Sequence, residues 1–367
     1  FISAKNLEDY VIKNENLKFI SEETYNKLGS GKLRPNDILF CLRGSLGKFA
    51  INKNSIKGAI ASSLVLLRAK EELNINYLKH YLKSPRIKRL VTKSDNGSSQ
   101  PNLSATNVKK FQIPLPPLDQ QKQIASILDT ADAYRQKTKA LIEKYDALTQ
   151  SLFLDMFGDP VINPKGWDKC DFGNYLTVLT DYHSNGSYKT LREHVTLKNE
   201  PDYALMVRTT DLENNNFVDG VNYIDEHAYN HLEKSKIFGG EIIINKIGSA
   251  GKVYRMPHLN RPVSLGMNAF LLRFNNSINQ SFLYFQLISS YGEREIQKRV
   301  KGAVTKTIRK DAVREIPILS PPLELQNQFA ERVKAIEAQK ALAQQELEKA
   351  DNLFNSLLQK AFKGELV

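Results

Sequence analysis

Two long stretches of the chain show the same helical spacing of apolar positions. Between Asp119 and Met156 there is no glycine and no proline, and Arg135 and Thr149 occupy two polar positions of the repeat. Counted together with these two, the positions of the repeat follow alternating steps of three and four, with one step of seven in the second stretch, which is typical of a helix that lies along another helix. They are Ile124, Leu128, Ala131, Thr138, Ile142, Tyr145, Leu152 and Met156 in the first stretch, and Phe329, Val333, Ile336, Ala343, Leu347, Ala350, Phe354, Leu357 and Ala361 in the second.

Both helices have clear start signals. Pro116-Pro117 precedes the first helix and Pro321-Pro322 precedes the second. Such a pair indicates a helix start, because proline is tolerated before and within the first turn of a helix. Gly158 followed by Asp159-Pro160 should end the first helix. A helix of about 38 residues is roughly 57 Å long at 1.5 Å per residue. Since the two apolar seams match, we expect the helices to pair in antiparallel directions.

A shift of 205 residues maps the first half of the chain onto the second. At slightly smaller offsets, of 204 and 203 residues, the β-type runs 37–40 and 241–244 and the Ile-Pro steps at Ile113 and Ile316 also align. The sequence therefore predicts an α+β fold with a tandem, pseudo-two-fold duplication. Two globular domains of mixed or antiparallel β-sheet with helices should be separated by two long antiparallel coiled-coil helices.

We expect four parts along the chain: a globular domain over residues 1–113, a helix over 114–160, a second globular domain over 161–316, and a C-terminal helix over 317–367. Residues 161–205 have no counterpart ahead of Phe1. We therefore expect the first domain to be incomplete at its N-terminus.

Positive charge is concentrated in the globular parts. Residues 1–113 carry 20 Lys and Arg against 9 Asp and Glu, and residues 161–316 carry 21 against 17, in a chain of net charge +12. Positive charge that is concentrated in particular segments is expected of a protein that binds a partner with a phosphate backbone. The alternative is that the positive charge serves solubility alone. The sequence contains no stretch of 18 consecutive apolar residues, so it predicts no membrane-spanning helix. Cys41 and Cys170 lack metal-site or disulfide spacing, so we expect a cytoplasmic protein.

A glycine-rich turn recurs in both halves, over residues 44–48 and 248–252. It is not a P-loop, which has four residues between its glycines and Ser or Thr after the lysine. The turn either joins two strands without further function or also brings Lys48 and Lys252 to a DNA backbone.

Basic segments follow, interrupted by Leu90, Val91, Ile296 and Val300, which should anchor the segments to a core. A merely solvated face is the alternative. The polar loops after them carry side chains able to reach base edges. The predicted DNA contacts are Arg43, Ser45, Lys48, Lys88, Arg89, Lys93, Ser98, Ser99, Gln100 and Asn102 in the first half, and Arg208, Lys246, Ser249, Lys252, Lys298, Arg299, Lys301, Thr305, Lys306 and Arg309 in the second.

Catalytic and metal-binding motifs are absent from the sequence. There is no Rossmann glycine fingerprint, no HExxH, no nucleophile elbow and no amino-methyltransferase motif. His227 and His231 could share a helix face, but no third ligand follows at useful spacing, so we interpret them as surface residues. The sequence predicts a binding subunit without catalytic residues.

The starts and ends of the two long helices resemble those of specificity (S) subunits of type I restriction-modification enzymes. The resemblance lies in the proline-led starts, Ile113 to Gln121 and Ile316 to Gln326, and in the ends, Leu154 to Pro160 and Phe362 to Leu366. The resemblance covers the whole chain. It implies two target-recognition domains that each read half of a split double-stranded DNA site, and helices that set the spacing and dock two methyltransferase (M) subunits.

The resemblance also implies that the partners hold the cofactors and do the chemistry. The M subunits would bind S-adenosylmethionine and methylate adenine N6, while restriction (R) subunits would use ATP and Mg for cleavage; this chain would bind no cofactor or metal. Two alternatives stay open. The chain could be the recognition module of a single-chain restriction-methyltransferase, or a coiled-coil adaptor with no role on DNA.

Overall fold

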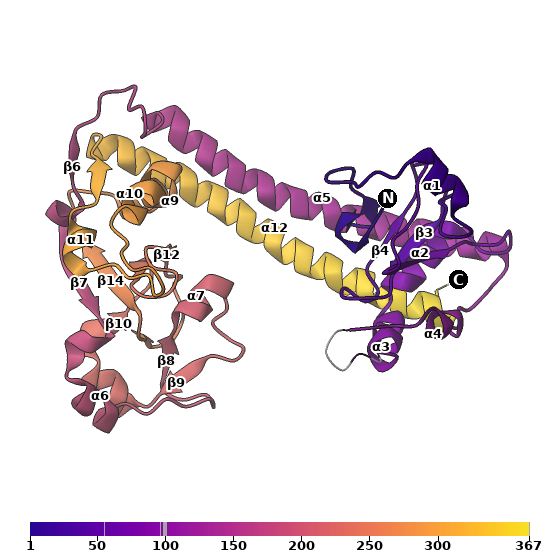
Figure 1. The fold of residues 1–367 in the computed structure, drawn as a ribbon. Helices are drawn as coiled ribbons and strands as arrows, with labels where there is room; N and C mark the ends of the chain where they lie inside the picture. The colour runs from indigo at the N-terminus through magenta and orange to yellow at the C-terminus, as the bar shows by residue number, and fades with distance from the viewer. Residues whose placement is uncertain (55, 96, 98–100, 367) are drawn as a thin grey trace. The chain divides into compact units, whose positions relative to one another are not determined.

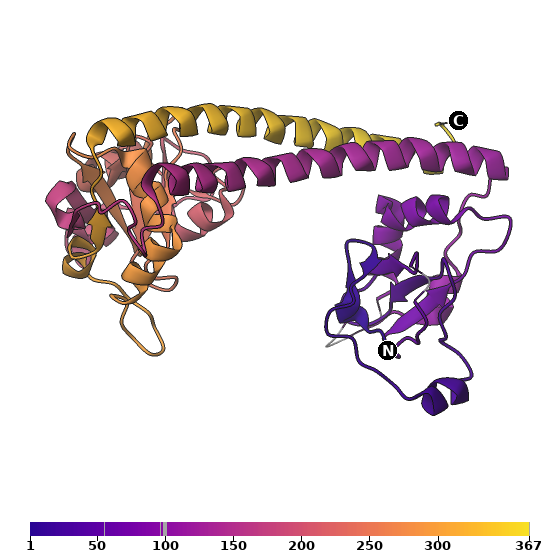
Figure 2. The same ribbon diagram turned by 90° about the horizontal axis from the view of Figure 1, so that it is seen from above.

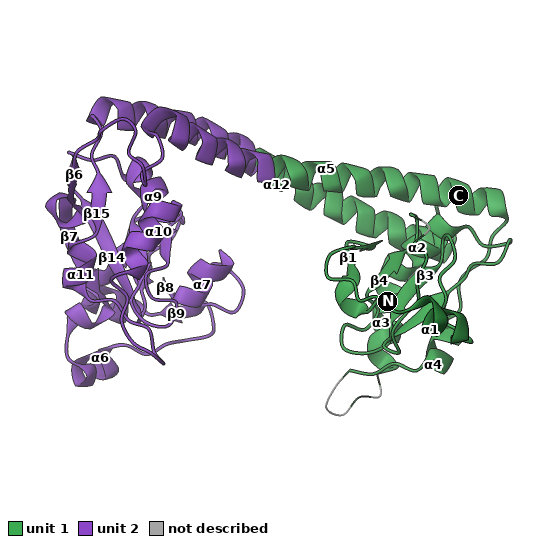
Figure 3. Ribbon diagram, turned by 45° about the horizontal axis from the view of Figure 1, so that its top comes forward, with its two compact units in different colours: residues 1–142, 342–367 green, residues 143–341 purple. Residues whose placement is uncertain are grey.

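The computed structural model describes residues 1–54, 56–95, 97 and 101–366. It divides into two compact units (Figure 3). Unit 1 contains Phe1–Ile142 and Leu342–Val367, and unit 2 contains Glu143–Ala341. Each unit thus combines one globular part with one portion of each of two long helices, α5 (Leu118–Phe157) and α12 (Leu323–Lys363).

Unit 1 is built on a three-stranded antiparallel sheet in the order β4–β3–β5 (Figure 1). Its strands and helices are β1 (Leu7–Glu8), β2 (Val11–Ile12), α1 (Glu22–Lys27), β3 (Ile38–Cys41), β4 (Phe49–Ile51), β5 (Leu64–Leu67), α2 (Ile75–Lys83), α3 (Pro85–Lys93) and α4 (Ala105–Lys109). One core joins the sheet to the long helices, because Phe40, Tyr77 and Tyr81 share an apolar cluster with Leu128 and Phe354.

Unit 2 contains two four-stranded sheets. One is antiparallel, in the order β12–β11–β14–β7, and the other has the order β10–β13–β8–β9 with a parallel β13–β8 pair. The elements are β6 (Lys169–Asp171), β7 (Leu176–Asp181), α6 (Tyr188–His194), β8 (Ala204–Val207), α7 (Thr209–Asn214), β9 (Asn222–Ile224), α8 (Glu226–His231), β10 (Lys236–Ile237), β11 (Ile242–Asn245), β12 (Val253–Arg255), β13 (Val263–Leu265), β14 (Ala269–Phe274), α9 (Gln280–Ile288), α10 (Ser290–Gln297), α11 (Lys310–Arg314) and β15 (Pro317–Leu319).

The long helices match the predicted pattern closely. All predicted seam positions of α5 and α12 are buried or half-buried. Within each unit the portions of α5 and α12 run side by side (Figure 2). Helix α5 ends where the sequence predicts: Gly158 adopts a left-handed φ of +77°, and the indole N–H of Trp167 donates a 2.8 Å hydrogen bond to the carbonyl of Phe157.

The two units repeat the same internal bonds at the predicted shift. In unit 1 the buried carboxylate of Asp37, just before β3, is 2.7 Å from the guanidinium of Arg68, directly after β5. In unit 2 the buried Glu241, just before β11, lies 3.1 Å from Arg273 of β14. Each pair ties the start of a central strand to its neighbour, so the duplication extends to individual side chains.

Candidate nucleic-acid interface

The glycine-rich turn is a tight connection between two antiparallel strands in each unit. In unit 2, Gly251 N–H donates to the carbonyl of Asn245 at 2.8 Å, and Asn245 N–H donates to the carbonyl of Lys252 at 2.9 Å. Gly251 has a φ of +85°, and a Cβ there would lie 2.5 Å from Ile296 of α10. Only glycine fits such a left-handed position against a neighbouring helix. The turn of unit 1 has the same left-handed backbone at Gly47, with a φ of +75°, but a Cβ there would lie 3.5 Å from Val91, an ordinary contact distance.

The polar loop of each unit lies against its glycine-rich turn. In unit 1, Gly44 N–H donates to the carbonyl of Pro101 at 3.1 Å, and Arg43 forms an antiparallel bridge with Asn102. In unit 2, Gly248 N–H donates to the carbonyl of Lys306 at 3.2 Å, and Ile247 bridges Thr307. The fold thus brings together, in each unit, the two segments that the sequence analysis selected separately. We call each pair a turn–loop platform: residues 43–48 with 101–102, and 246–252 with 301–307.

The platform of unit 1 presents the predicted polar side chains to solvent. Arg43, Ser45, Lys48 and Asn102 are exposed. Helix α3 packs its apolar face inward through Ile87 and Val91 and exposes its basic face, which is formed by Lys88, Arg89 and Lys93. Lys48 and Lys88 line one depression together with Thr92. The predicted contacts Ser98, Ser99 and Gln100 lie outside the described residues.

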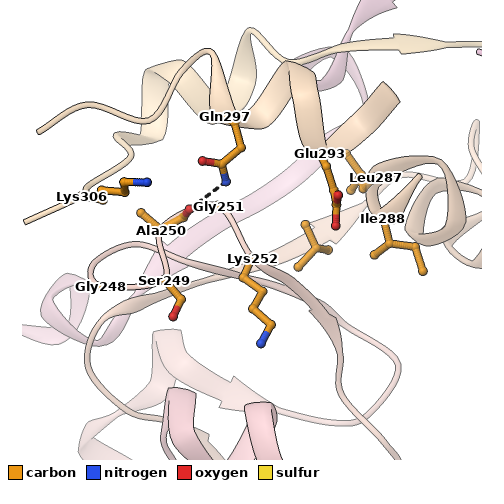
Figure 4. A pocket seen from close by; sticks show the side chains of 11 residues that line it. Gly248, Ser249, Ala250, Gly251, Lys252, Leu287, Ile288, Glu293, Gln297 and Lys306 are labelled. Atoms are coloured by element: carbon orange, nitrogen blue, oxygen red, sulfur yellow. Dashed lines mark hydrogen bonds between the residues drawn. The ribbon is translucent and has the colours of Figure 1, made fainter. Parts of the chain in front are cut away.

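The platform of unit 2 forms an equivalent hollow, drawn in Figure 4. Ser249, Lys252 and Lys306 line it, and the side-chain amide of Gln297 on α10 donates a 3.3 Å hydrogen bond to the carbonyl of Ala250. The further predicted contacts Lys301, Thr305 and Arg309 are exposed. Lys252 also lies 3.8 Å from Glu213.

Four other predicted contacts in unit 2 are held by carboxylates of the chain itself. Lys298 lies 2.7 Å and Arg299 3.4 Å from Glu295. These bonds, led by the hydrogen bond from Lys298, lower the pKa of Glu295. Arg208 lies 2.6 Å from Asp211. The fourth contact is Lys246 on the turn.

Lys246 lies 2.9 Å from Asp181. Burial opposes ionisation of this carboxyl, but hydrogen bonds from Ser184 and Lys246 and the charge of Lys310 hold its pKa at about 2. The Lys246 ammonium therefore faces a permanent negative charge. Together with Lys298, Arg299 and Arg208, it has a fixed internal partner that would compete with a phosphate.

The sequence analysis did not single out Thr92 and Gln297. They line the hollows of units 1 and 2 and differ by 205 positions. The shift of 205 residues between the two halves of the sequence could have identified these two residues as a corresponding pair. Each lies on the helix that packs against the glycine-rich turn of its unit. Their polar side chains, beside Lys48 and Lys252, extend the set of groups that can contact nucleic acid.

Two histidines that are 33 residues apart in the sequence lie close together in the structure. Nδ1 of His194 on α6 is 3.0 Å from Nε2 of His227 on α8. Across the described residues, no group of three or more His, Cys, Asp or Glu side chains is arranged to hold a metal ion. No helix in that part of the chain is long and apolar enough to cross a membrane.

Comparisons with known proteins agree with this arrangement. The family model described as type I restriction modification DNA specificity domain matches residues 2–144 and 180–352. The chain is 25% identical over 350 residues to the MjaVIII specificity subunit of Methanocaldococcus jannaschii, covering 90% of this chain and 79% of that protein. It is 21% identical over 393 residues to the EcoKI specificity subunit of Escherichia coli K12, covering 100% and 82%.

Two solved structures share the fold. One, from work on the assembly and conformational transition of the type I R-M system, has a TM-score of 0.57 at 19% identity and covers 100% of this chain and 91% of that chain. The crystal structure of the S subunit from M. genitalium has a TM-score of 0.52 at 19% identity, with 91% and 84% covered. The family model spans most of the chain, and the resemblance expected from the sequence is confirmed: the chain belongs to the type I restriction-modification specificity family, whose members are DNA-recognition subunits.

Proposed function

We propose that each unit of this chain reads one half of a split site in double-stranded DNA. The observation that carries the proposal is the turn–loop platform, which occurs twice with the same backbone hydrogen bonds. Gly44 to Pro101 in unit 1 corresponds to Gly248 to Lys306 in unit 2. Exposed lysines and polar side chains on each platform suit phosphate contacts and base-edge contacts respectively.

The long helices act, in this proposal, as an antiparallel coiled coil that spaces the two half-sites. Contacts within each unit support the pairing. In unit 1, Arg135 lies 2.5 Å from Asp351, and Tyr134 contacts Glu346 at 3.3 Å. In unit 2, Lys340 pairs with Asp146. In unit 2 the ring of Phe153 also lies 5.7 Å from that of Phe329, so the partner on α12 has a lower number where the residue on α5 has a higher one, as antiparallel helices require.

A second apolar stripe on α5 suits the docking of methyltransferase subunits. In unit 1, Ile127, Tyr134 and Leu141 recur every seven residues and are 39–50% exposed. They lie one position before the seam residues, where a two-stranded coiled coil usually carries charged residues. An apolar flank at this position favours contact with a further protein surface.

The chemistry of the enzyme belongs to these partners in the proposal. Methyltransferase subunits would bind S-adenosylmethionine and methylate adenine N6, and restriction subunits would use ATP and Mg for cleavage. The described part of this chain contributes exposed cations and polar side chains, which position and select DNA.

The test is DNA binding by the full chain, alone and with methyltransferase subunits, over a range of salt concentrations. We expect weak binding by the chain alone, and specific binding by the complex that falls steeply as salt rises, because phosphate contacts release counterions. Affinity that is unchanged between low and high salt would contradict the DNA-reading role and favour an adaptor.

A further inference from the structure

One apolar side chain stands among the polar groups of the unit 2 platform. Val304 is 98% exposed, and its neighbours Lys301, Thr305 and Lys306 are exposed as well. A single exposed valine is ordinary on a protein surface. Its position is informative here, because it lies in a loop that belongs to the DNA-reading platform.

The loop that carries Val304 is held in one shape at its base. Lys301 and Thr307 exchange two backbone hydrogen bonds of 2.8 Å. Gly302 has a φ of +110°, and a Cβ there would lie 2.1 Å from the carbonyl oxygen of Thr305. Figure 2 shows an orange loop standing out from unit 2 at this point of the chain. The closed base thus supports the loop on which Val304 is exposed.

Backbone bonds also fix the loop to the rest of the platform. Gly248 N–H donates to the carbonyl of Lys306, and Ile308 N–H donates to the carbonyl of Lys246 at 3.0 Å. Val304 is therefore presented by a supported loop, between lysines that suit phosphates. A DNA surface that accepts this loop must offer an apolar group between polar ones.

In the major groove that group is the methyl on C5 of thymine, the apolar feature of the base edges. Side chains that wedge between base steps are usually longer, such as Phe, Leu, Ile or Met, whereas valine ends at its two γ-methyl groups. We propose that Val304 is a specificity-determining residue that contacts the 5-methyl group of a thymine in the half-site read by unit 2. The proposal rests on the DNA-reading role of the platforms.

The test uses the full chain assembled with methyltransferase subunits and duplexes that contain the recognised site. Each thymine of the half-site is replaced, one at a time, by deoxyuridine, which lacks only the 5-methyl group. Three proteins are compared: the native chain, Val304→Ala, and Val218→Ala as a control. Val218 is 75% exposed in unit 2 but lies outside the platform. Because both side chains are exposed, neither substitution should change the unfolding midpoint.

At one thymine, we expect deoxyuridine to weaken binding by the native complex about fourfold, which is the value of one buried methyl group. Val304→Ala should bind the thymine duplex about that much more weakly and should not respond to deoxyuridine at that position. Val218→Ala should behave like the native chain.

The proposal would be overturned if binding by the native complex were insensitive to deoxyuridine at every position, or if the half-site contained no thymine. It would also be overturned if Val304→Ala kept the full sensitivity of the native chain to deoxyuridine. Neither result touches the proposed function, which fails only if binding to the recognised site itself is absent or independent of salt.

Discussion

The side-chain oxygen of Gln121 accepts a 2.8 Å hydrogen bond from the backbone N–H of Asn74, the residue that caps helix α2. The other end of the same amide donates to the carbonyl of Pro116 at 2.8 Å. Unit 2 repeats the arrangement, with Gln326 accepting from Asn279 at 2.8 Å. Both glutamines are buried, so each ties the first turn of a long helix to the globular part of its unit.

Replacing Gln121 by Ala should lower the free energy of unfolding of unit 1 by about 1–3 kcal/mol, because buried backbone groups lose their partner. Gln123→Ala, at an exposed position two residues away on α5, should change it by less than about 0.5 kcal/mol. Urea unfolding of the full chain measures both. Equal stability of the two variants would show that the amide does not fasten the helix to the domain.

His80 should make the stability of unit 1 depend on pH. Its side chain is fully buried and Nε2 lies 2.8 Å from Asp129, while Nδ1 has no partner among the described residues. Burial, followed by the charge of Lys79, lowers its pKa from 6.5 to about 4, although Asp129 acts in the opposite direction. The unfolded chain therefore takes up a proton at higher pH than the folded chain does.

The free energy of unfolding should consequently fall as pH drops from 6.5 to 4, by at most about 3 kcal/mol from this group. His80→Gln cannot titrate and should show a shallower loss over the same window. Asp129 affects the comparison little, because its pKa is lowered from 3.8 in the folded chain and most of its proton uptake lies below pH 4. Chemical unfolding at pH 6.5 and pH 4 gives the two slopes, and identical slopes would exclude His80 as the source.

Exposed and internally paired cations should differ in their contribution to DNA binding. Lys88→Ala with Arg89→Ala removes two exposed charges of α3 and should reduce the slope of log K against log salt by up to about 2. Lys298→Ala with Arg299→Ala should reduce it less, because Glu295 already holds both side chains.

The control for that experiment is Lys137→Ala with Lys139→Ala, at exposed positions of α5 away from the platforms. It should leave the slope unchanged. If the control matched the Lys88 and Arg89 variant, general charge rather than the platform would account for binding. Salt titration of the assembled complex provides all three slopes.

Local spacing was sufficient to predict the long helices, the duplication and the platform segments. Helix α5 begins at Leu118, directly after Pro116-Pro117, and ends at Phe157, directly before Gly158. The tight turns follow from the repeated glycines, since Gly47 and Gly251 both adopt a left-handed φ. These features depend on backbone conformation and on apolar periodicity, which neighbouring residues determine.

Which cations remain free could not be predicted in the same way. Lys246 and its partner Asp181 are 65 residues apart, and only the folded sheet brings them together. Gln121 and Gln326 stood within the quoted motifs, but their burial depends on the distant caps Asn74 and Asn279. Such pairs arise from tertiary contacts between segments whose sequences carry no common pattern.

Four residues inserted after Lys139 should lengthen the unread gap between half-sites by about one or two base pairs. The insertion adds about 6 Å of helix, against roughly 3.4 Å per base pair of DNA. Both half-sites should keep their sequences. The same four residues inserted after Val218, in a surface turn of unit 2, should leave the gap unchanged. Sequencing of DNA methylated by each complex reads the gap, and an unaltered gap after the helix insertion would mean that α5 does not set the spacing.

The central claim is that each unit reads its own half-site, and mapping of methylated adenines tests it most directly. Cells carrying the native chain with its methyltransferase are compared with cells carrying Ser45→Ala with Asn102→Ala, or Thr305→Ala with Lys306→Ala. We predict a native motif of two short blocks separated by unread bases. The unit 1 variant should relax the sequence of one block only, and the unit 2 variant should relax only the other. A contiguous motif, or two variants that alter the same block, would contradict the account.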